Sequence, residues 1–238
     1  MRAALLILVA AGLTGCHPVA DATGAAFGAT GELVALSGGG AGAANACFTC
    51  HGLAGQGDGA SVPRLAGLDS GYLQKQMEDY ASGLRADEVM GGIAGRLTHD
   101  ERRAVAAWYA GRPVPVVVAG PMKAPPAAYA ACVDCHGAAG EGGGAANPAL
   151  AGQPAAYTLE QLRRWKTVER RNDPRGVMTA AAAPLSEREM MAIAAWLETR
   201  PASPPPGNAA ASASAAGSAG AGSAAFRAGR RPDRPTGA

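Results

Sequence analysis

Two cysteine pairs, each followed directly by a histidine, are the groups in this chain whose types and spacing could do chemistry. The first run is Cys-Phe-Thr-Cys-His at 47–51, and the second is Cys-Val-Asp-Cys-His at 132–136. Cys-x-x-Cys-His is the attachment signal of a c-type haem. The two thiols add to the haem vinyl groups, and the histidine becomes the proximal ligand of the iron. The predicted attachment residues are Cys47, Cys50, Cys132 and Cys135, with His51 and His136 as proximal ligands.

Two other chemistries also use paired cysteines, namely a zinc site and a redox dithiol. A structural zinc ion needs four nitrogen or sulfur ligands that close one tetrahedron. A dithiol needs no histidine after it. The haem interpretation is favoured because the rest of the chain repeats around the same two runs.

The repeat extends well beyond the cysteines. Twelve residues after each histidine lies a proline, which begins a Pro-x-Leu-Ala-Gly segment. An aromatic residue, a second aromatic eight residues later, a methionine and a tryptophan follow in the same order in both copies. The second copy has three extra residues, near 172–174. We therefore interpret the chain as a tandem duplication of one module. The main landmarks are Pro63 and Pro148, Met90 and Met178, and Trp108 and Trp196.

The elements that position these groups are predicted to be helices. A short helix should lead into each Cys-x-x-Cys-His run, and a second should cover about 70–82 in one copy and 155–169 in the other. A third begins at Thr98-x-x-Glu101 or Ser186-x-x-Glu189, both of which are capping boxes. Apolar residues recur along the third helices at spacings of three and four, which predicts one buried face on each.

Each copy resembles a small class I cytochrome c domain, and the tandem is similar to the dihaem cytochrome c4 family of bacterial electron carriers. The resemblance covers about 41–200 and rests on Cys-x-x-Cys-His, Pro-x-Leu-Ala-Gly, the late methionine and the last helix. It implies an all-α fold, with two tandem domains that each wrap around one covalent haem c. It also implies that each proximal histidine donates to a proline carbonyl, here Pro63 and Pro148.

The sixth ligand of each iron is predicted by comparing the two copies of the repeat. Met90 and Met178 occupy equivalent places in loops ahead of the capping boxes, so we expect them to be the distal ligands. Met77, Met190 and Met191 are expected to pack in the cores or at their rims. Met122 lies in the linker, and His99 should be an exposed residue of a first helical turn.

A methionine on each iron raises its potential and closes it to substrates. The predicted function is therefore electron transfer without catalysis. By the resemblance, the donor would be a quinol-oxidising complex or a periplasmic dehydrogenase, and the acceptor a terminal oxidase or reductase. Two alternatives are a cytochrome subunit held in a dehydrogenase complex and a dihaem enzyme of the peroxidase or thiosulfate-oxidising type. The enzyme would need an open iron, or a cysteine or histidine as the distal ligand.

The N-terminus predicts export. Residues 1–15 combine a basic start, a short apolar stretch and small residues, which is typical of a secretory signal peptide. Leu-Thr-Gly-Cys at 13–16 resembles a bacterial lipobox, so we expect Cys16 to carry lipid and residues 16–40 to form a flexible tether. The predicted location is the periplasmic side of a bacterial membrane. His17 after the cysteine favours the outer membrane.

The remaining boundaries follow from composition. The predicted domains are 41–112 and 127–200, joined by a proline-rich linker at 113–126 and followed by a disordered tail at 201–238. The first domain has seven basic and eight acidic residues, and the second has eight of each. Such balanced charge lacks the concentrated basic face that nucleic-acid binding requires.

Overall fold

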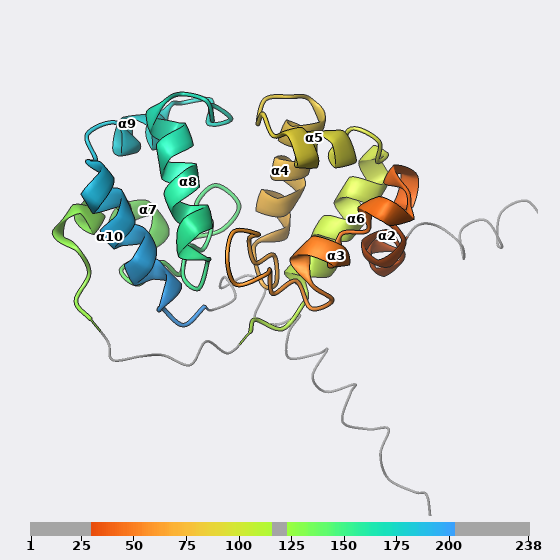
Figure 1. Cartoon of the computed structure of the whole chain (residues 1–238), viewed down its shortest axis with the longest axis horizontal. Helices are drawn as coiled ribbons and strands as arrows, with labels where there is room; N and C mark the ends of the chain where they lie inside the picture. The colour runs from red at the N-terminus through yellow and green to blue at the C-terminus, as the bar shows by residue number, and fades with distance from the viewer. Residues whose placement is uncertain (1–29, 116–122, 203–238) are drawn as a thin grey trace, which may run out of the picture.

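The computed structural model describes residues 30–115 and 123–202, which form two helical bodies side by side (Figure 1). No strand occurs within these two ranges, so the predicted all-α fold is confirmed. Module 1 contains α2 (Gly31–Ser37), the 3-10 helices η1 (Gly39–Ala41) and η2 (Ala43–Asn45), α3 (Phe48–His51), α4 (Ser70–Ala81), α5 (Glu88–Ala94) and α6 (His99–Ala110). Module 2 contains η3 (Ala127–Cys132), α7 (Val133–His136), α8 (Ala155–Lys166), α9 (Val177–Ala182) and α10 (Glu187–Glu198).

Helix α2 corrects the expected flexible tether. Residues 16–40 were expected to lie outside the first domain, but α2 packs against α6. Its residues Val34 and Ala35 are completely buried, and Thr30 caps its first turn by accepting a hydrogen bond from Leu33 N–H at 3.1 Å. Module 1 therefore begins at about residue 30. The helix has only seven residues and lies in a stretch rich in alanine and glycine, so no sustained apolar period marks it. Residues 16–29 lie outside the described ranges.

The helices that close each module begin as the sequence predicts. Both capping boxes form, with Thr98 and Glu101 at α6 and Ser186 and Glu189 at α10. In each box the hydroxyl oxygen accepts from the backbone N–H of the glutamate, whose carboxylate accepts from the N–H of the capping residue. These boxes fix where α6 and α10 start, and thus which of their faces meets the core.

Both apolar cores are small. The buried cluster of module 1 gathers residues from α2, α4 and α6, together with Ala149 from module 2. The buried cluster of module 2 has six members, namely Tyr129, Leu185, Met190, Ile193, Trp196 and Leu197. A domain of this size buries only a marginal apolar core by itself, so it needs an additional stabilising group.

The modules meet along α4 and α8, which face one another across the boundary (Figure 1). Arg85 donates hydrogen bonds to the side-chain oxygens of Gln76 (2.9 Å) and Gln161 (2.8 Å). Arg170 donates to the same two oxygens, at 3.1 Å and 2.8 Å. The backbones of the two arginines also form an antiparallel bridge. All four residues lie at equivalent positions of the repeat, so the same contacts are made from both sides.

A further pair of contacts crosses the boundary between each central helix and the opposite methionine segment. Arg164 on α8 donates to the carbonyl of Ala86 (2.6 Å) and lies 3.4 Å from the Asp87 carboxylate. Asp79 occupies the equivalent position on α4 and accepts from Asn172 at 2.6 Å. The two contacts are related by the repeat, but the helix residue is a cation in one and a carboxylate in the other, and Asn172 is neutral where Asp87 is charged.

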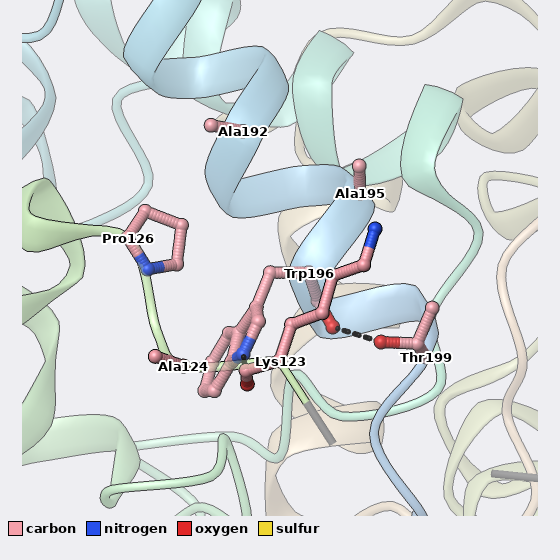
Figure 2. A pocket seen from close by; sticks show the side chains of 7 residues that line it. All are labelled: Lys123, Ala124, Pro126, Ala192, Ala195, Trp196 and Thr199. Atoms are coloured by element: carbon pink, nitrogen blue, oxygen red, sulfur yellow. Dashed lines mark hydrogen bonds between the residues drawn. The ribbon is translucent and has the colours of Figure 1, made fainter. Parts of the chain in front are cut away.

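Residues 123–126, which end the linker, lie against α10. The indole Nε1 of Trp196 donates to the carbonyl of Lys123 at 3.0 Å, beside a pocket of about 410 Å³ (Figure 2). This pocket contains no cysteine, histidine or methionine, so it is separate from the predicted chemistry.

Among the described residues, no single helix is long and apolar enough to cross a membrane. Only the bent pair Gly31–Ala41 and Ala43–His51, at 118°, qualifies by length and composition.

One backbone position is strained. Val168, in the turn after α8, has φ of 61°, whereas the equivalent residue of module 1 is Gly83 with φ of 78°. The left-handed region suits glycine and is a true outlier for a β-branched residue. The two copies therefore make the same turn, but module 2 makes it at a conformational cost.

Candidate functional site

The two Cys-x-x-Cys-His runs form one-turn helices, α3 and α7, at the same place in both modules. Within each pair, the first cysteine is half-buried and the second is exposed. Burial raises the pKa of the Cys47 and Cys132 thiols. Each turn ends at a glycine with positive φ, Gly52 or Gly137. One thiol therefore faces the module and the other lies at its surface.

Each histidine ring is buried and oriented by one backbone carbonyl. Nδ1 of His51 lies 3.0 Å from the carbonyl oxygen of Pro63, and Nδ1 of His136 lies 2.8 Å from that of Pro148. Because a carbonyl can only accept, Nδ1 must carry the proton, which leaves Nε2 with its lone pair. Burial lowers the pKa of both imidazoles, although the proline carbonyls oppose this effect. Both rings are therefore held in the neutral form and tautomer that can bind a metal through Nε2.

The two methionines predicted as distal ligands lie in short helices rather than in loops, which corrects the sequence analysis. Met90 is in α5 and Met178 is in α9, and both side chains are half-buried. An aspartate fixes each backbone, since Asp87 accepts from Met90 N–H at 2.9 Å and Asp173 accepts from Met178 N–H at 2.8 Å. Asp87 is the N-cap of α5, whereas α9 begins after Gly176 and Asp173 holds it from five residues before Met178. An aspartate shortly before each methionine was the sequence signal for these helices.

The other sulfur and imidazole groups are placed largely as expected. Met77 packs against the core of module 1, and Met190 is buried in the core of module 2. The expectation for Met191 is wrong, because it is 52% exposed on the solvent face of α10. His99 is an exposed residue of the first turn of α6. Met122 and Cys16 lie outside the described residues.

The zinc alternative finds no ligand set in the described ranges. Nowhere in them do three or more histidine, cysteine, aspartate or glutamate side chains gather closely enough to hold a metal ion. The two cysteine pairs belong to separate modules and have separate histidines. A four-thiolate site would need both pairs at one point.

Several buried polar groups fit a bound haem. The hydroxyl of Tyr109 and the Nε atoms of Arg64 and Arg85 are buried, and none has a hydrogen-bond partner in the described part of the chain. Three arginines, Arg64, Arg85 and Arg170, are buried near the module boundary, where Asp79 is the buried carboxylate. Haem carries two propionates and a large apolar face. A haem in each module would therefore supply acceptors, negative charge and the core surface that the small modules lack.

The inter-module network was missed by the sequence analysis, although the repeat contained a signal for it. Glutamine stands four residues, and arginine thirteen residues, after the first aromatic in both copies. Only the glutamines lie on the expected helices, and periodicity says nothing about burial. Gln76 and both arginines are buried, and Gln161 is half-buried, because each fills the hydrogen-bonding needs of the other copy.

Comparison with known proteins agrees with this arrangement. The family model "Cytochrome c" matches twice, at residues 35–110 and 126–201. A relative from Stutzerimonas stutzeri (strain A1501) named "Thiosulfate dehydrogenase electron acceptor" is 40% identical over 181 residues, which are 70% of this chain and 84% of the relative.

Two solved structures are similar as well. Reduced recombinant cytochrome c4 from Pseudomonas stutzeri has a TM-score of 0.57 and 28% identity, with 65% of this chain and 93% of that chain covered. Thiosulfate dehydrogenase (TsdBA) from Marichromatium purpuratum has a TM-score of 0.60 and 37% identity. That match covers 72% of this chain but only 40% of that chain.

Proposed function

Because this chain belongs to the cytochrome c family and resembles cytochrome c4 in carrying two such domains, we propose that each of its irons has one histidine and one methionine ligand. The chain is a dihaem electron carrier with two covalently bound haems c. In the proposed arrangement each haem is attached through one Cys-x-x-Cys pair. The proposed axial pairs are His51 with Met90 and His136 with Met178.

One observation carries the proposal, namely that both modules present the same kinds of groups. Each has a neutral, buried imidazole that is oriented by a proline carbonyl twelve residues later. Each also has a methionine whose backbone N–H donates to an aspartate, which lies three residues before Met90 and five before Met178. Bound haem supplies the one-electron chemistry of iron, and the chain holds and buries it. Two closed irons suit electron transfer better than catalysis.

The spectrum of the reduced protein with and without carbon monoxide tests this ligation. We expect no change, because methionine occupies the sixth position of both irons. A carbon monoxide complex in half of the haem would instead indicate one open iron and would favour the enzyme alternative. The same complex in all of the haem would overturn the proposed ligation in both modules.

The relatives suggest a donor for the chain. Because one relative is named as the electron acceptor of thiosulfate dehydrogenase, we propose that this chain also accepts electrons from such an enzyme. In this scheme the dehydrogenase oxidises thiosulfate, and the electrons pass one at a time to the two haems. A quinol-oxidising complex is the other candidate donor, and a terminal oxidase or reductase would accept the electrons.

Reduction assays distinguish a free carrier, a bound subunit and an enzyme. We expect thiosulfate to reduce the chain only when a thiosulfate dehydrogenase is added. Reduction by thiosulfate alone would indicate catalysis by the chain itself. Co-purification of chain and dehydrogenase after expression from one cell would favour a permanent subunit, whereas separate elution would favour a shuttle.

We propose that the chain works on the periplasmic side of a bacterial membrane, anchored through lipid on Cys16. The support is the signal-like segment at 1–15 and the lipobox-like residues that end it. Mass spectrometry of the mature N-terminus tests the lipid. A Cys16→Ser variant should move the protein from the membrane fraction to the soluble fraction, and equal membrane association of both proteins would contradict the anchor.

A further inference from the structure

Arg64 is a buried cation at the boundary between the modules. It follows Pro63, whose carbonyl orients His51, and it is only 1% exposed. Its guanidinium donates through Nη1 to the carbonyl of Ala66 and through Nη2 to the carbonyl of Ala151, the latter at 3.0 Å. The acceptors that it reaches are therefore neutral backbone oxygens, one from each module.

The two carbonyls are equivalent in the repeat. Ala66 follows Pro63 by three residues, and Ala151 follows Pro148 by three. The guanidinium thus lies between matching atoms of the two copies, close to the axis that relates them. Two long side chains cannot occupy one point on such an axis. The second copy accordingly has Ala149 where the first has Arg64.

Arg64 has polar surroundings, whereas the equivalent residue Ala149 has apolar ones. Gln153 of module 2 holds the backbone of Arg64, accepting from its N–H at 3.0 Å and donating to its carbonyl at 2.9 Å. The residue equivalent to Gln153 in module 1 is Leu68, which shares a buried cluster with Ala149. One side of the boundary is therefore polar and holds a cation, and the equivalent side is apolar.

The charge of Arg64 persists in this site. Burial lowers its pKa, but only to about 10, so the guanidinium stays protonated at neutral pH. A cation stabilises the state of a nearby group that carries more electrons, and low polarity strengthens the effect. Reduction of a haem iron adds one electron. A cation shared between the modules therefore favours the reduced form of both haems.

We propose that the single buried charge of Arg64 acts on both haems and raises both of their reduction potentials. This goes beyond the proposed ligation and rests on it only in requiring two redox-active haems. A residue that served one haem alone would sit against one module. Arg64 instead binds equivalent carbonyls of both.

The first test is an optical redox titration of Arg64→Met, which removes the charge and keeps an unbranched side chain. We expect both one-electron components to move to lower potential by similar amounts. At a fixed applied potential, the ratio of reduced to oxidised haem should fall about three- to tenfold for each haem, and tenfold corresponds to 59 mV. A shift in one component only, or in neither, would overturn the proposal.

A charge-retaining control separates charge from packing. Arg64→Lys keeps the cation but loses the two-pronged contact. We expect it to hold both potentials much closer to those of the wild-type protein. Equal shifts in the lysine and methionine variants would mean that geometry rather than charge sets the potentials, and the proposal would fail.

An exchange across the repeat provides the sharpest test. The variant R64A/A149R/L68Q/Q153L places the arginine and its clamp on the opposite side of the boundary. We expect this variant to restore both potentials relative to Arg64→Ala, because the cation returns to the same point. If it folds with both haems and restores neither potential, the shared-charge model is wrong. Should it not fold, the lysine and methionine variants still decide the question.

Haem content and the carbon monoxide spectrum are recorded for each variant. They report on the proposed ligation and should not change. A loss of haem would count against the proposed ligation. Unequal shifts in the two reduction potentials, with both haems intact, would contradict only the proposal for Arg64.

Discussion

The two modules make the same arrangement around their Cys-x-x-Cys-His runs but differ at one part of the boundary between them. The cysteines, histidines, proline carbonyls and capping boxes recur at matching positions, and in both modules an aspartate accepts from the backbone N–H of the methionine. The boundary instead pairs Arg64 with Gln153 and Ala149 with Leu68. The three extra residues of module 2 lie beside Asn172, which binds Gln76 and Asp79 of module 1.

This pattern separates two pressures on a duplicated module. Iron ligation demands the same geometry from each copy, so these residues stay alike. Two copies that pack about an axis cannot both place a long side chain on it, so residues near that axis must diverge. Residues a little further away, such as Gln76 and Gln161, meet twice and can stay the same.

The largest expected effect comes from removing a distal methionine. Met90→Ala and Met178→Ala should each open one iron, so that about half of the haem binds carbon monoxide and its potential falls. Met77→Ala and Met191→Ala are matched controls that should leave both irons closed. If only one of the two ligand variants bound carbon monoxide, the two modules would not ligate their irons in the same way.

The next effect comes from the shared network. Arg85→Ala and Arg170→Ala each remove bonds to the buried Gln76 and the half-buried Gln161, so the free energy of unfolding should fall by about 2–4 kcal/mol in each case. Denaturant titration measures it. Arg103→Ala, at an exposed ion pair, should change stability by less than about 0.5 kcal/mol. A large cost at one arginine and almost none at the other would contradict the equivalence of the two sides.

A smaller effect is expected in the turns after α4 and α8. Gly83→Val should destabilise module 1 by about 1–2 kcal/mol, because a left-handed backbone disfavours a side chain. An added Cβ at Gly83 meets no atom within 4 Å, so the cost is one of backbone conformation. Val168→Gly should stabilise module 2 by up to about 1 kcal/mol, since part of the gain is offset by the entropy of glycine. Thermal unfolding measures both, and a loss of stability in Val168→Gly would show that the valine side chain is needed.

The smallest effect is an acid dependence of the Met178 segment. Burial tends to raise the pKa of Asp173, but hydrogen bonds from the N–H groups of Met178, Arg175 and Val177 outweigh it and lower the pKa. A depressed carboxylate contributes stability above its unfolded pKa of about 3.9, which is lost as the pH falls through the folded value. Asp173→Asn should flatten the stability profile below about pH 4. An unchanged acid limb would mean that this carboxylate does not hold the segment.

Much of the site could be predicted because its determinants are local. The Cys-x-x-Cys-His runs, the capping boxes and the matched offsets each involve residues close together in sequence. Helix α2 was missed because it has only seven residues and lies in a stretch rich in small residues, and the helices around Met90 and Met178 were missed because they have only seven and six residues. Met191 was misplaced because adjacent residues on a helix point in different directions, and only packing shows which one is buried.

Covalent attachment and helix capping depend on short spacings, so the residues alone specify the two haem modules, their order and the groups that could hold each iron. Packing between the modules sets which polar residues become buried and which copy supplies the cation between them, because burial depends on what the other copy brings to the same place. From the sequence, Arg64 would be expected to be a surface arginine, but contacts with Ala151 and Gln153 bury it.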